Sequence, residues 1–291
     1  MLYACLTGRS PIDGRARWTR AAVRAGKVAP AGGSAAGAGG GVPEVSGTAA
    51  SGPRDGGGGG RRSGPLAAPR SLLGANGEPA GWKQRTGAAV QRLTPADGSF
   101  TVRATTPTLL ELARNPGHND YRLTAQVRHL AGDGAVGLYV ADTTLSANTE
   151  PLHLFTRAGF SERGGDPRAD LSTRLLLDAP GAAPVEAAIA TLSGPPVPPA
   201  GGGEPPWRDV EITVTAETLA ARIDGARVET AMGDWVTRFG AGIAAVRPRF
   251  PPHPIVQKSV GFLHRRGGIG LYLQNGAASF RNIQVTPLLA E

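Results

Sequence analysis

Two carboxylates stand two residues apart on one predicted strand. Asp209 and Glu211 lie in the segment WRDVEITVT at 207–215, where they alternate with Val210 and Ile212. Residues at positions i and i+2 of a strand share a face at roughly 6–7 Å, and glycosidases use two carboxyl groups about 5–5.5 Å apart for retention or about 6.5–9.5 Å apart for inversion. A pair that cleaves glycosides is one interpretation. A solvated strand surface is the other, because the opposite face is apolar.

Aromatic side chains suggest a second kind of chemistry. Sugar-binding sandwich proteins lay aromatic ring faces against pyranose rings, and Tyr139, Trp207, Trp235 and Tyr272 are the candidates here. Tyr139 and Tyr272 fall on the strand face opposite the nearby aliphatic residues. Each is therefore expected either at the surface or under a loop, whereas a Trp at a strand start, such as Trp207, often anchors the core or an edge.

The sequence gives weaker indications of a metal site. The five histidines contain no pair at i, i+2 or i, i+4, so a zinc site would have to be assembled from distant segments. Calcium accepts carboxylate and carbonyl oxygens, and Asp120, Asp133 and Asp142 stand at predicted strand ends or turns. These aspartates are calcium candidates, with service to their own turns as the alternative. No other cofactor is expected.

A glycine motif at 132–137 (GDGAVG) matches the dinucleotide fingerprint G-x-G-x-x-G literally. That fingerprint follows a strand and opens a helix, whose amides meet the pyrophosphate. Here the run opens a predicted strand instead. We therefore interpret it as a turn between two strands and expect no nucleotide site.

Glycine and charge divide the chain near residue 80. Of the 43 glycines, 19 lie in residues 1–80, which also hold 10 Lys and Arg against 4 Asp and Glu. Such a segment buries too little apolar surface to offset its ordering entropy. We predict a long disordered N-terminal segment over 1–80 and one folded domain over 81–291. The basic residues are scattered, so no specific nucleic-acid binding is expected.

The start of the chain gives little indication of location. Cys5 is the only cysteine, so no intrachain disulfide forms. The first thirty residues hold no apolar run long enough for a signal peptide or a membrane span. A cytoplasmic location is the default expectation, and an extracytoplasmic one follows if Met1 is not the biological start. No transmembrane segment is expected.

Short alternating segments dominate residues 81–291. Tyr121–Leu130 shows a clear alternation of apolar and polar residues, and 136–141 is predicted to return as its hairpin partner. Segments 207–215, 219–223 and 226–230 predict a three-stranded meander with a turn at Asp224-Gly225. The pattern predicts about 10–13 strands, no helix, and an all-β antiparallel sandwich.

The last thirty residues are the most regular. Ile269, Leu271 and Leu273 alternate with Gly270, Tyr272 and Gln274 before Asn275-Gly276, a dipeptide that favours a two-residue hairpin turn. An odd step in the apolar pattern predicts a β-bulge near Arg281-Asn282. Segments 191–206 and 238–254 are rich in proline or glycine and are predicted as long loops.

Three segments resemble a known family. Residues 268–287 (GIGLYLQNGAASFRNIQVTP) are similar to the closing motif of 3-keto-disaccharide hydrolase domains, which belong to the concanavalin A-like, laminin-G-like sandwich superfamily. Residues 207–225 and 121–139 resemble strand pairs of the same domains. The resemblance implies a bacterial jelly-roll sandwich in a superfamily of lectins, glycosidases and surface modules. The segment after the Tyr121 strand departs from the hydrolase pattern, so only the fold is carried over.

The leading hypothesis is a non-catalytic binding or interaction module whose partner is a carbohydrate or another protein. The alternative is a glycoside-processing hydrolase of the 3-keto-disaccharide hydrolase type. No catalytic residue is assigned. The sequence leaves the ligand and the oligomeric state open.

Overall fold

The computed structural model describes residues 68–94, 97–147, 150–162, 167–178, 182–198, 203–250 and 263–288. All of these residues belong to the unit Ser63–Glu291, one of the two units into which the chain divides. The predicted disordered segment lies outside the described residues as far as residue 67, and so does Cys5. Residues from 70 onward already join the sandwich, because Arg70 and Ser71 pair with the last strand and Leu72 is buried.

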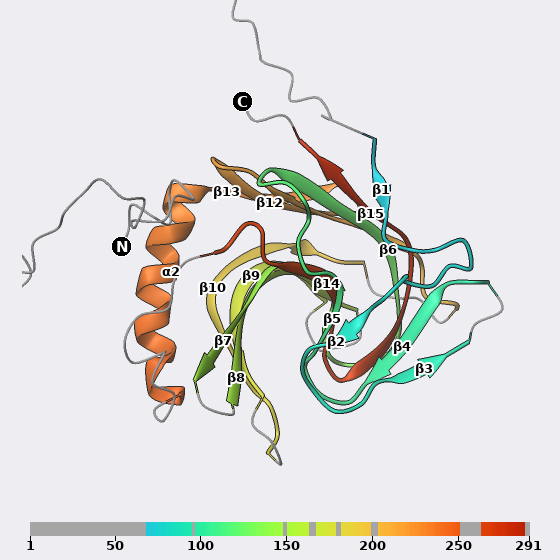
Figure 1. Cartoon of the computed structure of the whole chain (residues 1–291), viewed down its shortest axis with the longest axis horizontal. Coiled ribbons are helices and arrows are strands. Elements are labelled where there is room, and N and C mark those ends of the chain that lie inside the picture. The colour runs from blue at the N-terminus through green and yellow to red at the C-terminus, as the bar shows by residue number, and fades with distance from the viewer. Residues whose placement is uncertain are drawn as a thin grey trace, which may run out of the picture. The chain divides into compact units, whose positions relative to one another are not determined.

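The described residues form two antiparallel sheets and one α-helix, which confirms the predicted all-β sandwich (Figure 1). Sheet 1 has the order β13 (Ala226–Ala231), β12 (Thr218–Ile223), β11 (Arg208–Val214), β6 (Tyr121–Gly132), β15 (Gly276–Pro287), β4 (Phe100–Ala104), β3 (Gln91–Leu93), with β1 (Arg70–Ser71) also on β15. Sheet 2 has the order β10 (Val185–Pro196), β9 (Arg168–Leu177), β8 (Glu150–Ser161), β7 (Val136–Ala147), β14 (Gly268–Leu273), β5 (Thr108–Ala113), β2 (Lys83–Gln84).

Alternation places the core between the sheets. On β6, Tyr121, Leu123 and Val127 are fully buried while Arg122 and Thr124 on the other face are half-buried. The inward residues of β11 and β15 meet those of β7 and β14 in one large apolar cluster. Burial of this apolar surface is the main force that holds the two sheets together.

The predicted meander is confirmed, and two predicted hairpins are wrong. Strands β11, β12 and β13 are consecutive antiparallel neighbours. In contrast, β6 lies in sheet 1 and its predicted partner β7 in sheet 2, and β14 and β15 are likewise in different sheets. Both connections are corners that carry the chain from one sheet to the other.

The two corners pack on each other, which explains their glycines. The Asn275 side-chain amide donates to Asp133 Oδ1 at 2.6 Å, and the Gln274 N–H donates to the Ala135 carbonyl at 2.9 Å. A Cβ on Gly134 would lie 1.6 Å from the Gln274 carbonyl oxygen. The motif at 132–137 therefore serves a close backbone approach between corners. The predicted bulge is also confirmed, because pairing of β15 with β6 shifts register between Arg281 and Gln284.

The helix α2 (Met232–Val246), followed by the 3₁₀ turn η1 (Arg247–Arg249), corrects the prediction of a loop over 238–254 as far as residue 250. Its buried residues are Met232, Trp235, Phe239 and Val246, an apolar stripe of helical period. Gly242 lets the helix approach β10, since a Cβ there would lie 1.7 Å from the Ile189 carbonyl oxygen. The loop predicted over 191–206 is also shorter, because β10 continues to Pro196. No helix in these described ranges is long and apolar enough to cross a membrane.

Sheet 2 is strongly curled. Tyr272 on β14 and Glu186 on β10 are four strands apart, which is about 19 Å in a flat sheet. Their side chains nevertheless meet, with the Tyr272 hydroxyl 3.0 Å from Glu186 Oε1. The face of sheet 2 that points away from sheet 1 is therefore concave, as Figure 1 shows.

Candidate functional site

The outward face of sheet 1 carries a row of polar side chains on β11. Because Val210, Ile212 and Val214 are buried against the core, Asp209 and Glu211 point outward. Strand pairing extends the row sideways: Glu211 lies opposite Thr124 on β6 and opposite Arg222 on β12. Alternation in a strand thus places both predicted carboxylates on one solvent-facing surface.

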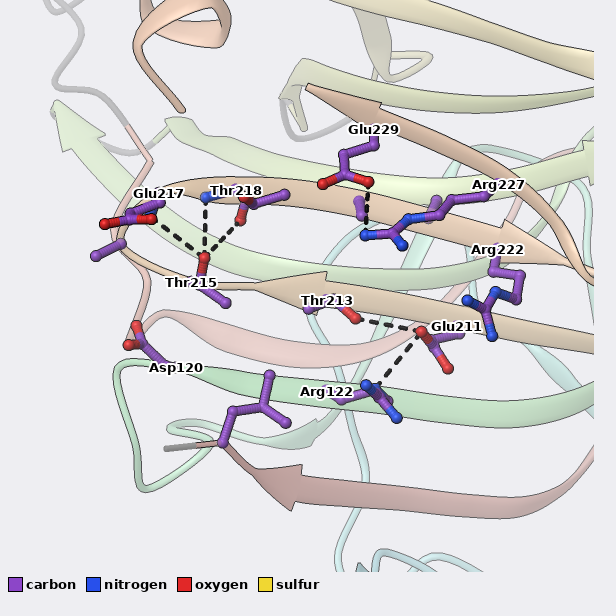
Figure 2. Close-up of a pocket in the computed structure, with 14 residues that line it drawn as sticks. Asp120, Arg122, Glu211, Thr213, Thr215, Glu217, Thr218, Arg222, Arg227 and Glu229 are labelled. Atoms are coloured by element: carbon purple, nitrogen blue, oxygen red, sulfur yellow. Dashed lines mark hydrogen bonds and ion pairs between the residues drawn. The ribbon is translucent and has the colours of Figure 1, made fainter. Parts of the chain in front are cut away.

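Two adjoining cavities hollow this surface, and we call them together the outer groove. Their volumes are about 340 Å³ and 580 Å³, and Glu211 and Arg222 line both. Figure 2 shows the first cavity, with side chains from β6, β11, β12 and β13. Its charged lining residues are Asp120, Arg122, Glu211, Glu217, Arg222, Arg227 and Glu229.

Exposed ion pairs hold part of this lining. Arg122 Nε lies 3.5 Å from Glu211 Oε1, which also accepts a hydrogen bond from Thr213 at 3.3 Å. Arg227 lies 2.5 Å from Glu229. Within the described part of the chain, Arg222 makes neither an ion pair nor a side-chain hydrogen bond. Pairs this exposed contribute about 0–1 kcal/mol each, so the lining is free to rearrange around a ligand.

Gln126 organises the second cavity. Its amide donates to Asp209 Oδ1 at 3.0 Å, and its carbonyl oxygen accepts from Arg281 Nε at 2.8 Å and from Asn282 at 3.1 Å. Gln126, Asp209 and Asn282 all line the cavity. The sequence prediction did not include Gln126, although its outward position on β6 follows from the alternation there.

Trp207 stands just before β11, beside this end of the outer groove. Two guanidinium groups lie over its ring, that of Arg128 at 4.5 Å and that of Arg281 at 4.1 Å from the ring centroid. Arg128 also pairs with Asp97 at 2.6 Å. Hydrogen bonds from Ser99, with a smaller contribution from Arg128, hold the pKa of Asp97 below its usual value. The Trp207 ring is thus in contact with two cations, and the residue is half-buried.

The concave face of sheet 2 receives two of the other predicted aromatics. Tyr139 and Tyr272 both pack on Phe155, with ring centroids 6.0 Å and 5.9 Å away, and all three side chains are fully buried. Burial raises the pKa of both tyrosines. Trp235 is buried elsewhere, on α2, where its indole N–H donates to Thr173 at 3.1 Å.

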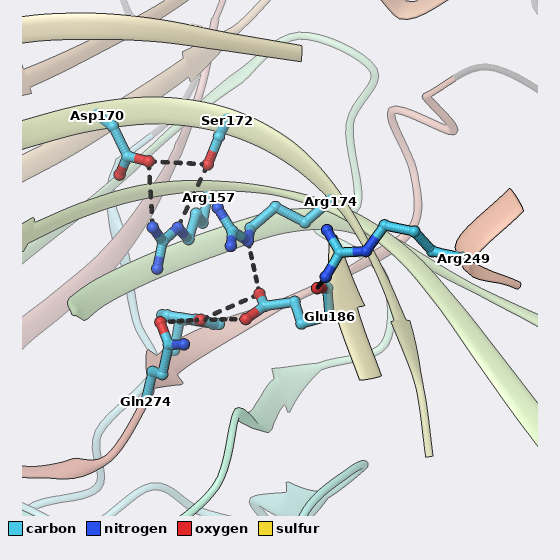
Figure 3. A network of polar contacts seen from close by, with 8 residues as sticks. Arg157, Asp170, Ser172, Arg174, Glu186, Arg249 and Gln274 are labelled. Atoms are coloured by element: carbon cyan, nitrogen blue, oxygen red, sulfur yellow. Dashed lines mark hydrogen bonds and ion pairs between the residues drawn. The ribbon is translucent and has the colours of Figure 1, made fainter. Parts of the chain in front are cut away.

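Charged residues on the same concave face form the network shown in Figure 3. Arg157 lies over the Tyr272 ring at 4.5 Å and pairs with Asp170 at 3.1 Å. Glu186 accepts from Tyr272 at 3.0 Å and pairs with Arg174 at 2.6 Å. We call these residues, with Ser172, the concave network. Its members hold strands β8, β9, β10 and β14 together across the curl.

The structure does not bring the three calcium candidates together. Asp120 and Asp133 lie at opposite ends of β6, where Asp120 pairs with Arg265 and Asp133 accepts from Asn275. Asp142 is buried on β7 with the His153 ring 3.0 Å away. Among the described residues, no group of three or more His, Cys, Asp or Glu side chains is placed to hold a metal ion.

No protein-family model matches the chain, and no curated protein matches it. Several solved structures are similar. The carbohydrate-binding module CBM66 from Bacillus subtilis is 12% identical over 71% of this chain and 95% of its own, with a TM-score of 0.40. A protein of unknown function with a galectin-like fold from Bacillus subtilis is 13% identical over 72% and 90%, also at 0.40.

An alginate lyase from Pseudomonas aeruginosa is 16% identical over 62% of this chain and 73% of its own, with a TM-score of 0.32. The fold assignment rests on the strand order and the registers of the two sheets.

Proposed function

We propose that the protein is a non-catalytic saccharide-binding module and that the outer groove holds the ligand. Arg222 carries this proposal. It lines both cavities, lies opposite Glu211 in strand register, and has no partner of its own in the described ranges. Cross-strand neighbours stand about 5 Å apart, so an arginine donor and a carboxylate acceptor are presented side by side.

This arrangement suits the hydroxyl groups of a sugar, each of which both donates and accepts hydrogen bonds. Bonds to charged side chains are stronger than bonds between neutral groups. The volumes of the two cavities also lie in the range of about 300–1,000 Å³ that is usual for small-molecule sites. A short oligosaccharide is therefore the ligand class that we favour.

A glycan array probed with residues 63–291, followed by calorimetric titration of any hit, tests the proposal. Arg222→Ala is expected to weaken binding at least tenfold. Arg103→Ala is the matched control, because Arg103 is an exposed arginine on β4 of the same sheet and lies outside the outer groove. An array without any hit, or equal affinities for wild type and Arg222→Ala, would refute the proposal.

Glycoside cleavage is a second candidate, and one observation favours it: Asp209 and Glu211 line the same cavity. Their i, i+2 spacing of roughly 6–7 Å on one strand overlaps the lower end of the separation of about 6.5–9.5 Å that inverting glycosidases use. Cleavage would release reducing sugar from the array hits, and Asp209→Asn and Glu211→Gln would each abolish that release. Binding without release would leave the non-catalytic function.

A further inference from the structure

Two arginines face each other across the last hairpin of sheet 1. Arg222 on β12 and Arg227 on β13 are direct register partners, two residues before Asp224 and two residues after Gly225 of the hairpin turn. Both are exposed, and both line the 340 Å³ cavity, as Figure 2 shows. Like charges directly opposite each other destabilise a sheet. The pair therefore costs stability in the unliganded protein.

The surrounding carboxylates compensate this repulsion only in part. Arg227 has Glu229, two residues along its own strand, but the two side chains are 52% and 41% exposed. Such a pair contributes little and exchanges readily. On the other side of Arg222, Glu211 shares its Oε1 with Arg122 and Thr213, so its charge is divided between two arginines.

The remaining acidic residues of the cavity stand at its other end. Glu217 belongs to the turn between β11 and β12, and Asp120 precedes β6 and pairs with Arg265. At the centre of this cavity three arginines (Arg122, Arg222 and Arg227) outnumber two glutamates (Glu211 and Glu229), whereas the end at Asp120 and Glu217 is acidic. Such a charge distribution suits a ligand with one negative group at the centre and neutral hydroxyl groups beyond it.

We propose that the ligand is an acidic saccharide whose negatively charged group bridges Arg222 and Arg227. This inference rests on the proposed function and narrows it to one ligand class. A carboxylate or sulfate group between the two guanidinium groups replaces their repulsion with two charge-assisted hydrogen-bonded contacts. Planar guanidinium groups suit such anions better than ammonium groups do.

Titration of the protein with one oligosaccharide in a charged and an uncharged form tests the inference. Oligogalacturonate with ionised carboxylates is compared with the same oligomer after full methyl esterification. A sulfated galactan oligomer of equal length distinguishes sulfate from carboxylate. We expect a charged oligomer to bind at least tenfold more tightly than the ester. Higher salt is expected to reduce this difference, because the arginines are exposed.

The variants are Arg222→Gln and Arg227→Gln, alone and together, with Arg103→Gln as the control. The double variant is expected to bind the charged oligomer and the ester with equal affinity, whereas the control keeps the wild-type preference. The inference alone is overturned if the wild-type protein binds the charged oligomer and the ester with equal affinity. It is also overturned if the double variant still prefers the charged oligomer. Absence of binding to every saccharide, charged or neutral, overturns the proposed function itself.

Discussion

The outer groove and the concave network are built from the same residue types and differ in burial. Glu186 and Arg157 of the concave network are 5% and 7% exposed. In the outer groove, Glu211 is 22% exposed and Arg122 is 44% exposed. Charge is costly to bury unless it is fully paired. Buried charges here therefore join strands, while exposed charges are left available for a ligand.

The largest effect is expected from removing one buried charge. Glu186→Ala leaves Arg174 without its carboxylate and Tyr272 with Gln274 as its remaining acceptor, and breaking a buried pair in this way costs about 3–5 kcal/mol. Urea denaturation followed by fluorescence measures the loss. Glu186→Gln, which keeps an acceptor, should lose less. A loss below about 1 kcal/mol for Glu186→Ala would show that the concave network does not hold the curl.

Alkaline pH tests the buried tyrosines of the same face. Because burial raises the pKa of Tyr139 and Tyr272 in the folded state, the folded protein keeps these protons above pH ~10, where unfolded tyrosine releases them. Below pH ~10 both tyrosines are protonated in the folded and the unfolded state, so they do not make the free energy of unfolding depend on pH. Above it, each tyrosine lowers that free energy by up to about 1.4 kcal/mol per pH unit.

Denaturant unfolding at increasing pH, together with the ultraviolet absorbance of tyrosinate, follows this effect. Tyr272→Phe should make the decline less steep by one tyrosine's contribution. Ionisation of both phenols near pH 10 while the protein remains folded would contradict the burial argument.

The smallest effect is expected in the outer groove. Glu211→Ala removes an exposed partner of Arg122, so the free energy of unfolding should change by no more than about 1 kcal/mol. Glu229→Ala, which removes the partner of Arg227, serves as a parallel case. A loss as large as that for Glu186→Ala would remove the distinction between the two surfaces.

The positions of individual strands could be predicted from alternation. Which strand pairs with which could be predicted only in part. The meander of β11, β12 and β13 follows from local pattern and turn residues, and so does the bulge after Arg281. The corners at 132–135 and 274–276 carry the same local signals as hairpins. A turn dipeptide specifies a reversal of the chain and leaves open which sheet receives the next strand. Only packing between the two corners decides that.

The helix α2 escaped prediction for a related reason. Gly233, Gly240 and Gly242 lower its intrinsic propensity, yet Gly242 is what lets it lie against β10. The site was partly predictable. Asp209 and Glu211 were placed on an outward face by alternation, whereas the importance of Arg222 and Arg227 depends on their register.

The sequence alone determined the class of fold and the outward position of the β11 carboxylates, because a period of two in apolar residues specifies a strand with one buried face. Tertiary structure decided the rest. Curling of sheet 2 buries Tyr139 and Tyr272, and strand register brings the two arginines together beside Glu211. Both depend on contacts between residues far apart in the chain, which no local pattern encodes.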